Sequence, residues 1–289
     1  MGRGKLLKRL ANEVLPPELA SAVWNRVELI GDIALIRAPP SIAPEALRPL
    51  AERLLQELKY VRSVWVGYPG VSGAYRLRPY VHLAGEPRSE AVYKEHGCLF
   101  KVDVTKAYIS PSLSYEHLRV AKLVRDGEVV TNMFAGVGPF SIIIARHARP
   151  RKVYSIDINP DAYRYMVENV KLNKVQEVVE PILGDAAEVV ETRLKGTSDR
   201  VLMPYPDIAL EYLRYAMDAL RDDGGVIHLY LHVRAERGED PVERAKEAAL
   251  PRLAGLSRSH EVLFGRVVRM IAPRTYQVVL DIRAIPSKA

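Results

Sequence analysis

The sequence predicts an α/β protein, in which a doubly wound, mostly parallel sheet with an antiparallel edge strand follows a smaller α+β module. From about residue 114, short apolar strands alternate with amphipathic helices, an order typical of parallel sheets covered on both faces. Before that point, short strand-like and helical patterns are mixed with turns, as in an α+β module. A chain of 289 residues with 48% hydrophobic residues is large enough to bury both cores.

The expected organisation has three parts: a helical segment at 1–26, the α+β module at 27–105 and the large α/β domain at 106–289. Within the module, residues 43–59 have the apolar spacing of a helix. The alternation of strands is found in GDIALIRA, VRSVWV, YRLRPYVHLAG and CLFKVDVT.

The large domain contains the alternating pattern that predicts its sheet. Its strands are expected in EVVTNMF, KVYSIDI, VVEPILGD, DRVLMPY and GGVIHLYLHV, and its helices at 139–147, 160–173, 207–221 and 236–252. The last segment, EVLFGRVVRMIAPRTYQVVLDIRAI, has two strand-like runs joined around Pro273. These runs predict an antiparallel pair that completes one edge of the sheet.

Composition excludes several classes of protein. No segment approaches the ~20 apolar residues that a membrane-spanning helix requires, and the basic N-terminus lacks the apolar stretch of a secretory signal. We therefore expect a cytoplasmic protein without a membrane partner. The single cysteine, Cys98, allows no internal disulfide and no clustered-cysteine site, and no metal is expected. A net charge of +7 is compatible with a polyanionic partner without establishing one.

A glycine loop, FAGVGPF, follows the first strand of the large domain, where a doubly wound fold binds its ligand. Gly136 and Gly138 allow a tight turn and a close approach of the backbone to a ligand. Pro139 can open the next helix, because its missing N–H falls among the unpaired donors of the first turn. Ser141 stands where a pyrophosphate-binding fingerprint has its third glycine, which counts against NAD or FAD.

Two acidic residues follow the next two strands. Asp157 comes 21 residues after Gly136, the spacing at which a carboxylate meets ribose hydroxyls in either class of cofactor. Asp185, after the third strand, is suited to accept a hydrogen bond from an exocyclic amino group such as that of adenine. The same residues could be ordinary turn and cap residues. Their succession at consecutive strand ends favours a nucleoside without a diphosphate, and S-adenosylmethionine fits that description.

With these residues in place, the chain resembles the archaeal tRNA methyltransferases that modify N1 of guanosine 37, next to the anticodon. The similar blocks run from about Gly31 to His228 and are GDIALI, YKEHGCLFKVDVTKAYISPSLSYEHLRVA, NMFAGVGPFSI, YSIDINPDAYRYMVENVKLNKV and PILGDAAEV. The resemblance implies a class I S-adenosylmethionine-dependent methyltransferase fold for the large domain. It also implies cofactor contacts from a set of residues at the strand ends: His117, Phe134, Gly136, Gly138, Asp157, Ile158, Asp185, Ala186 and Pro204.

The resemblance also implies the catalytic residues. N1 of neutral guanine carries a proton, so its methylation needs a base to remove the proton and a cation to stabilise the charge that develops on O6. Glu116 in SYEH matches the general base of the family. Arg76 in YRLRP matches the arginine that stabilises O6, with Arg78 as the alternative.

Two positions depart from the family pattern. Many base methyltransferases end the fourth strand with Asn-Pro-Pro-Tyr or Asn-Leu-Pro, which hold a flipped base near the methyl donor. This chain has MPYP, with Pro204 in the asparagine position, and Tyr205 and Pro206 are expected to contact the substrate base. Ser112 stands where many relatives have arginine. Both changes put the efficiency, and the type of reaction, in question.

The expected partner is the tRNA anticodon stem-loop, bound by a monomer. The α+β module offers basic and aromatic side chains suited to phosphates and unstacked bases: Arg37, Arg62, Arg76, Arg78, Arg88, Lys101, Trp65, Tyr68 and Tyr75. A solvated basic face would explain these charges equally well. Three other functions stay open: aminocarboxypropyl transfer to a wyosine precursor at the same nucleotide, C7 methylation of that precursor, and tRNA binding with little catalysis. GCLFKVDV and SPSLSYEH resemble the methyltransferases more closely.

Overall fold

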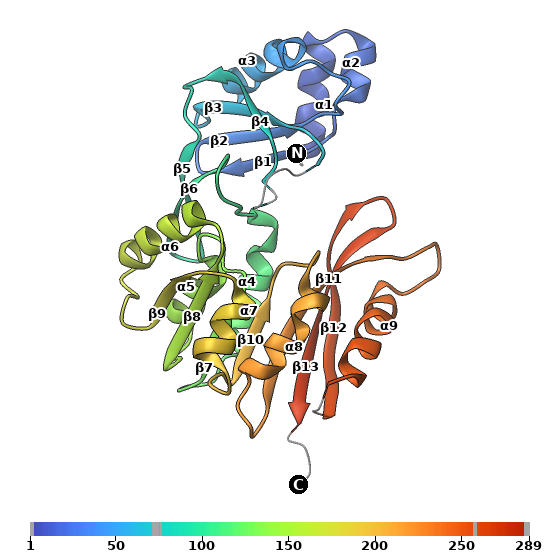
Figure 1. Ribbon diagram of the computed structural model, residues 1–289. Helices are drawn as coiled ribbons and strands as arrows, with labels where there is room; N and C mark the ends of the chain where they lie inside the picture. Colours follow the sequence, from blue (N-terminus) through green and yellow to red (C-terminus); the bar gives the residue numbers. More distant parts are fainter. Residues whose placement is uncertain (1–2, 71–74, 76, 257–258, 286–289) are drawn as a thin grey trace. The chain divides into compact units, whose positions relative to one another are not determined.

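The chain forms two compact units, residues 1–111 and 112–289, in a computed structural model (Figure 1). The structure describes residues 3–70, 75, 77–256 and 259–285. Each unit has its own sheet and its own hydrophobic core.

Unit 1 (residues 1–111) is the α+β structure that the sequence predicts. Its main sheet has the strand order β1-β2-β3-β4 among the described residues. These strands are β1 (Val27–Ile30), β2 (Ile33–Arg37), β3 (Ser63–Gly67) and β4 (Tyr80–Gly85). The expected helix at 43–59 is present as the 3-10 turn η1 (Pro44–Leu47) followed by α3 (Arg48–Glu57). A separate antiparallel hairpin pairs β5 (Glu90–Glu95) with β6 (Cys98–Asp103).

The N-terminal helices are built into the core of unit 1. They are α1 (Arg3–Val14) and α2 (Pro17–Ala22), and Leu7 and Leu10 of α1 are completely buried. Both leucines belong to the same hydrophobic cluster as Leu50 and Leu54 of α3 and Val64 of β3. The segment 1–26 therefore folds together with the module that follows it.

Unit 2 (residues 112–289) contains a seven-stranded sheet of order β12-β13-β11-β10-β7-β8-β9 within its described residues. The strands β9, β8, β7, β10 and β11 are parallel, and β12 and β13 form the antiparallel edge, as predicted. The elements in chain order are the turn η2 (Pro111–Leu113) at the division, α4 (Ser114–Leu123), β7 (Val129–Asn132), α5 (Pro139–His147), β8 (Lys152–Asp157), α6 (Pro160–Leu172), β9 (Val179–Leu183), α7 (Ala186–Val189), the π-helical turn η3 (Val190–Leu194), β10 (Arg200–Met203), α8 (Ala209–Ala219), β11 (Gly225–Arg234), α9 (Pro241–Ala254), β12 (Ser259–Ala272) and β13 (Thr275–Ile285).

Helices cover both faces of this sheet. Buried residues of α7, α8 and α9 share one hydrophobic cluster with Leu229, Leu231 and Leu280 of β11 and β13. Side chains alternate between faces along a strand, so Tyr230 and Asp281 point to the opposite face, where both contact α4. The doubly wound architecture predicted from the alternating pattern is thus confirmed.

The last helix begins later than its charge pattern predicts. It was expected at 236–252, and α9 begins at Pro241. The Asp240 side chain accepts a hydrogen bond from the Val242 N–H, which caps the helix, and Pro241 occupies the first turn. The cap therefore sets a boundary that the spacing of charged residues does not show.

Candidate active site

The expected cofactor residues lie at one edge of the sheet of unit 2. Phe134, Asp185 and Pro204 follow β7, β9 and β10, respectively, and Asp157 is the last residue of β8. These four strands are parallel neighbours in the order β10-β7-β8-β9. Because the carboxyl ends of parallel strands meet at the same edge, the four positions are brought together where doubly wound folds bind ligands.

The glycine loop has the backbone geometry that its sequence predicts. Gly136 has φ of 57° and Gly138 has φ of 95°, a region that favours glycine. Pro139 is the first residue of α5. A Cβ on Gly138 would lie 3.1 Å from Ile142 and 3.2 Å from Met166, so this glycine also permits close packing against the two helices that follow.

Two buried polar side chains that the sequence analysis did not assign hold this loop. The Asn132 side-chain amide donates to the Ser141 hydroxyl at 3.2 Å, which gives the serine at the third-glycine position a role within the protein. The Asn169 side-chain amide of α6 donates to the Val137 carbonyl at 3.0 Å. Asn169 lies in the interior of α6, where the neighbouring sequence does not indicate a contact with the glycine loop. The contact depends on how α6 packs against that loop.

Asp157 fastens the loop to the end of β8. Its Oδ2 accepts from the Gly136 N–H at 2.6 Å and its Oδ1 from the Asn159 N–H at 2.9 Å. Burial raises the pKa of Asp157, and these two backbone hydrogen bonds oppose that shift. Each oxygen keeps a second lone pair with which it could accept a ribose hydroxyl. Ile158 beside it is 54% exposed and offers an apolar surface to a ligand.

Both oxygens of Asp185 accept hydrogen bonds within the protein. Oδ1 accepts from the Ala187 N–H at 2.8 Å and caps α7, and Oδ2 accepts from the Tyr212 hydroxyl of α8 at 2.7 Å. Burial, and then the hydrogen bond and charge of Asp185, raise the pKa of Tyr212 to about 12. Ala186, the first residue of α7, is buried. Tyr212 is thus a functional candidate that sequence reasoning did not identify.

Three aromatic rings lie together beside these carboxylates. Phe134 makes edge-to-face contacts with Tyr205, at 5.6 Å between ring centroids, and with Tyr212, at 5.3 Å. Pro204, Tyr205 and Pro206 follow β10 and are each partly exposed. The structure therefore brings an expected cofactor residue and an expected substrate residue into direct contact.

The residues at this edge fit the adenosine part of S-adenosylmethionine. Asp157 and Asp185 supply the acceptors that ribose hydroxyls and an adenine amino group require. Partly exposed Ile158 and Phe134 supply apolar surface for the purine ring. The segment 133–145 contains no lysine or arginine that could balance a diphosphate.

Glu116 and His117 lie on the first turns of α4, and both are only 1% exposed. Glu116 Oε2 accepts from Arg119 Nε at 2.9 Å and from the Tyr230 hydroxyl at 3.0 Å. The His117 ring contacts Phe140 of α5 edge to face, at 4.4 Å between centroids. The expected base, Glu116, is therefore buried and hydrogen-bonded to Arg119 and Tyr230. The neighbouring His117 packs against α5, the helix that follows the glycine loop.

The expected substrate cations are less well defined. Arg76 lies outside the described residues. Arg78 of unit 1 donates from Nη1 to the Tyr68 carbonyl at 2.6 Å, and burial lowers its pKa. In unit 2, the guanidinium of Arg269 on β12 donates to the Ser112 hydroxyl. A guanidinium group thus reaches Ser112, the position at which the family resemblance predicts an arginine.

Two further properties concern only the described residues. None of the described helices is long and apolar enough to cross a membrane. In the same part of the chain, no three histidine, cysteine, aspartate or glutamate side chains are grouped so that they could hold a metal ion.

With this geometry established, comparison with known proteins assigns the family. Residues 91–255 match the TRM5/TYW2 methyltransferase domain. The chain belongs to this family. It is 45% identical over 279 residues to the tRNA 4-demethylwyosine(37)-methyltransferase of Saccharolobus solfataricus, covering 96% of this chain and 98% of that one. It is 39% identical to a tRNA (guanine(37)-N(1))-methyltransferase of Pyrococcus abyssi, covering 93% of this chain and 78% of that one.

Solved structures agree with the family assignment. The crystal structure of Trm5b from Pyrococcus abyssi superposes with a TM-score of 0.81 at 37% identity, covering 95% of this chain and 80% of that one. Trm5 of Methanocaldococcus jannaschii, crystallised with adenosine, gives 0.78 at 32% identity, covering 93% and 76%. The TRM5/TYW2 enzymes are S-adenosylmethionine-dependent and modify tRNA. The predicted family, fold class and cofactor are thereby confirmed.

Proposed function

We propose that this protein transfers the methyl group of S-adenosylmethionine to the base of nucleotide 37 in tRNA, acting as a monomer on the anticodon stem-loop. The observation that carries the proposal is that two relatives, 45% and 39% identical to this chain and covering 96% and 93% of it, are both named as methyltransferases at this nucleotide. The two carboxylates and the partly exposed apolar side chains at the sheet edge support the same cofactor.

Guanine N1 is the first candidate for the methylated atom. Bound S-adenosylmethionine supplies an electrophilic methyl group. Glu116 would accept the N1 proton, and the electron pair left on N1 would form the new bond to the methyl carbon. Arg76 would stabilise the negative charge that develops on O6. Phe134 and Tyr205, which are in contact, would place the base beside the cofactor.

A wyosine precursor is the second candidate substrate, and two observations favour it. The relative that is 45% identical over 98% of its own length is named for 4-demethylwyosine. In addition, Pro204 offers no side-chain hydrogen bond where many base methyltransferases have asparagine. In the tricyclic precursor the guanine N1 and exocyclic nitrogen are closed into a third ring, so such a base has fewer polar groups on that edge to recognise.

One experiment distinguishes these functions. The protein is incubated with S-adenosylmethionine and two tRNA preparations, one carrying guanosine at position 37 and one carrying 4-demethylwyosine, and the nucleosides are analysed by mass spectrometry. We expect a product heavier by one methyl group from at least one tRNA, and the tRNA that yields it identifies the substrate. An aminocarboxypropyl adduct, or no product from either tRNA, would overturn the proposal.

A further inference from the structure

The carboxylate of Glu116 is held unequally at its two oxygens. Oε2 accepts two hydrogen bonds, from Arg119 Nε at 2.9 Å and the Tyr230 hydroxyl at 3.0 Å, so both of its lone pairs are used. Oε1 receives no hydrogen bond from the described residues and faces Arg266 of β12 at 3.1 Å. Oε1 is itself buried, and the Arg266 side chain beside it is 29% exposed, against 11% for the Arg119 side chain beside Oε2.

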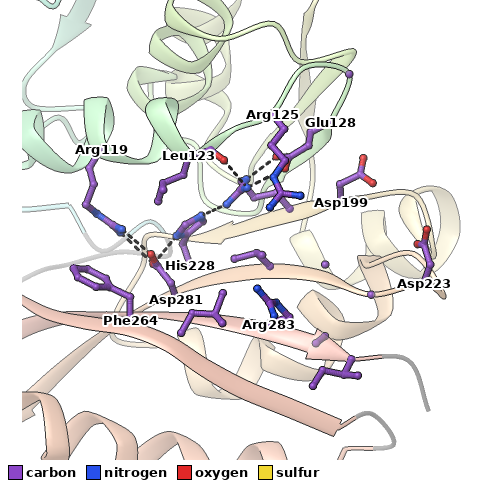
Figure 2. Close-up of a pocket in the computed structure, with 18 of the residues that line it drawn as sticks. Arg119, Leu123, Arg125, Glu128, Asp199, Asp223, His228, Phe264, Asp281 and Arg283 are labelled. Carbon is purple, nitrogen blue, oxygen red and sulfur yellow. Dashed lines mark hydrogen bonds and ion pairs between the residues drawn. The ribbon is translucent and has the colours of Figure 1, made fainter. Parts of the chain in front are cut away.

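Arg119 is itself fixed by a second carboxylate. Its Nη1 and Nη2 donate to Asp281 of β13 at 2.6 Å and 3.2 Å (Figure 2). Its Nε donates to Glu116. Burial opposes ionisation of Asp281, but hydrogen bonds from His228 and Arg119, with the charge of Arg119, lower its pKa to about 2. One guanidinium thus joins two carboxylates in a fixed orientation, a geometry for which its planar fork is suited.

The contacts of Asp281 continue away from Glu116. Arg200 can only donate, so its Nη1 at 2.8 Å requires His228 Nε2 to accept, and His228 Nδ1–H then donates to Asp281 Oδ1 at 2.6 Å. Burial, acting against the Asp281 hydrogen bond, lowers the pKa of His228, which agrees with this neutral form. Arg200 is in turn bound by Glu128 at 2.8 Å and donates to the Leu123 carbonyl at the end of α4.

We propose that Arg119, oriented by Asp281, is a positioning residue for catalysis: it holds Oε2 of Glu116 so that Oε1 is presented to the substrate base as the proton acceptor. The inference rests on the proposed function, in which Glu116 is the base. Both lone pairs of Oε2 accept hydrogen bonds, whereas Oε1 has only the ion pair with Arg266, which the substrate base would have to displace. The planar guanidinium of Arg119, held by Asp281 at two nitrogens, keeps the Glu116 carboxylate in one orientation relative to the sheet.

The test is the single-turnover methylation rate with the tRNA on which the wild-type protein is active. Arg119→Gln should slow this rate roughly 10- to 100-fold, the size expected when a reacting group is misplaced by about an ångström. Apparent affinities for S-adenosylmethionine and tRNA should stay near the wild-type values. Arg283→Gln is the matched control, because Arg283 lies on β13 in the same cavity but pairs with Glu261, and it should keep the wild-type rate.

The pH profile separates positioning from a loss of folding. The charged and titratable groups around Glu116 are Arg119 on the same helix, Tyr230 on β11, Arg266 on β12 and, through Arg119, Asp281 on β13. Removal of the Arg119 cation makes a neighbouring carboxylate harder to ionise, so the acid limb of the rate profile should move to higher pH in Arg119→Gln. Arg119→Lys, which retains the charge, should return that limb to its wild-type position.

A cavity of about 960 Å³ along this cluster permits a second check. Arg119, His228 and Asp281 line it (Figure 2), so a small cation can reach the place of the missing side chain. Guanidinium ion at non-denaturing concentration should restore part of the rate of Arg119→Ala, and sodium chloride at equal concentration should not.

The outcomes separate this inference from the proposed function. If the wild-type protein methylates no tRNA, the proposed function fails before any variant is compared. If the wild-type protein is active and a folded Arg119→Gln protein keeps both its rate and its pH profile, the positioning role of Arg119 is refuted.

Discussion

At the residue scale, Asp185 illustrates how one carboxylate is prepared for a ligand. Its Oδ1 caps α7 and its Oδ2 accepts from Tyr212, so the carboxylate plane is fixed from two directions. A fixed acceptor loses little conformational freedom when an amino group binds to it, which is the general advantage of preorganisation. We therefore propose that Tyr212 supports cofactor binding through Asp185, while its ring packs on Phe134.

This arrangement predicts the effect of removing one hydroxyl group. Tyr212→Phe keeps the ring contact with Phe134 but leaves Asp185 Oδ2 without its donor, so binding of S-adenosylmethionine should weaken by about 1 kcal/mol. Calorimetric titration measures the change. Tyr215→Phe removes the hydroxyl of the neighbouring tyrosine on α8, which has no bond to Asp185, and should leave the affinity unchanged. Equal affinities for Tyr212→Phe and the wild-type protein would show that the Asp185 contact is unimportant for binding.

At the element scale, α4 is attached to the sheet by charged side chains on one face. Arg119 bonds to Asp281 of β13, Glu116 to Tyr230 of β11, and the Leu123 carbonyl at the end of the helix to Arg200 of β10. Buried charge pairs are costly to break, because the remaining partner is left without compensation. The register of α4 against three strands is therefore set by polar geometry as much as by apolar packing.

Asp281 makes this attachment sensitive to acid. Its pKa is about 2 in the folded protein, below the ~3.9 of an exposed aspartate. Its ionised form therefore stabilises the fold above about pH 4, and that contribution is lost as the pH falls from about 4 to about 2. Asp281→Asn should lower the free energy of unfolding by about 3 kcal/mol at pH 7, and the difference from the wild-type protein should shrink across that window.

Urea unfolding of both proteins between pH 2 and pH 7 measures this difference. Glu261→Gln, which breaks an exposed pair with Arg283, is the control and should show almost no difference at any pH, because such pairs contribute little. A difference between Asp281→Asn and the wild-type protein that stays constant down to pH 2 would contradict the assignment of the acid response to Asp281.

The same elements show which features a sequence can predict. The glycine loop, Asp157 and Asp185 were predictable because strand, turn and helix signals are local and the fold places consecutive strand ends at one edge. The partners of Arg119 and Glu116 were not, since they lie 162 and 114 residues away along the chain. Glu116 was found only through family resemblance, and its surroundings depend on how β11, β12 and β13 pack against α4.

At the scale of the whole molecule, the net positive charge does not show which basic side chains are available to bind phosphate. The net charge is +7, yet several basic residues expected to meet tRNA have acidic partners in unit 1. Arg88 pairs with Asp32 at 2.7 Å, Arg62 with Glu86 at 3.3 Å and Lys101 with Glu90 at 3.2 Å. Exposed pairs of this kind are weak in water, so a phosphate can replace the carboxylate at little cost.

Arg62 offers the sharpest test of a phosphate contact. Its side chain is 65% exposed, and its Nη1 lies 3.3 Å from Glu86 Oε1, which is longer than a strong charge-assisted hydrogen bond. If tRNA phosphates displace counterions at the basic residues of unit 1, the logarithm of affinity should fall linearly with the logarithm of salt concentration. Arg62→Gln should weaken binding and reduce this slope by about one, as expected for one lost phosphate contact. Arg9→Gln removes an arginine of α1 in the same unit, which pairs with Glu13 of α1 and Glu57 of α3 and lies outside the expected tRNA surface. This variant should leave the slope unchanged. Filter binding from low to moderate salt gives both slopes. Equal slopes for Arg62→Gln and Arg9→Gln would mean that net charge, rather than a contact at Arg62, attracts the tRNA.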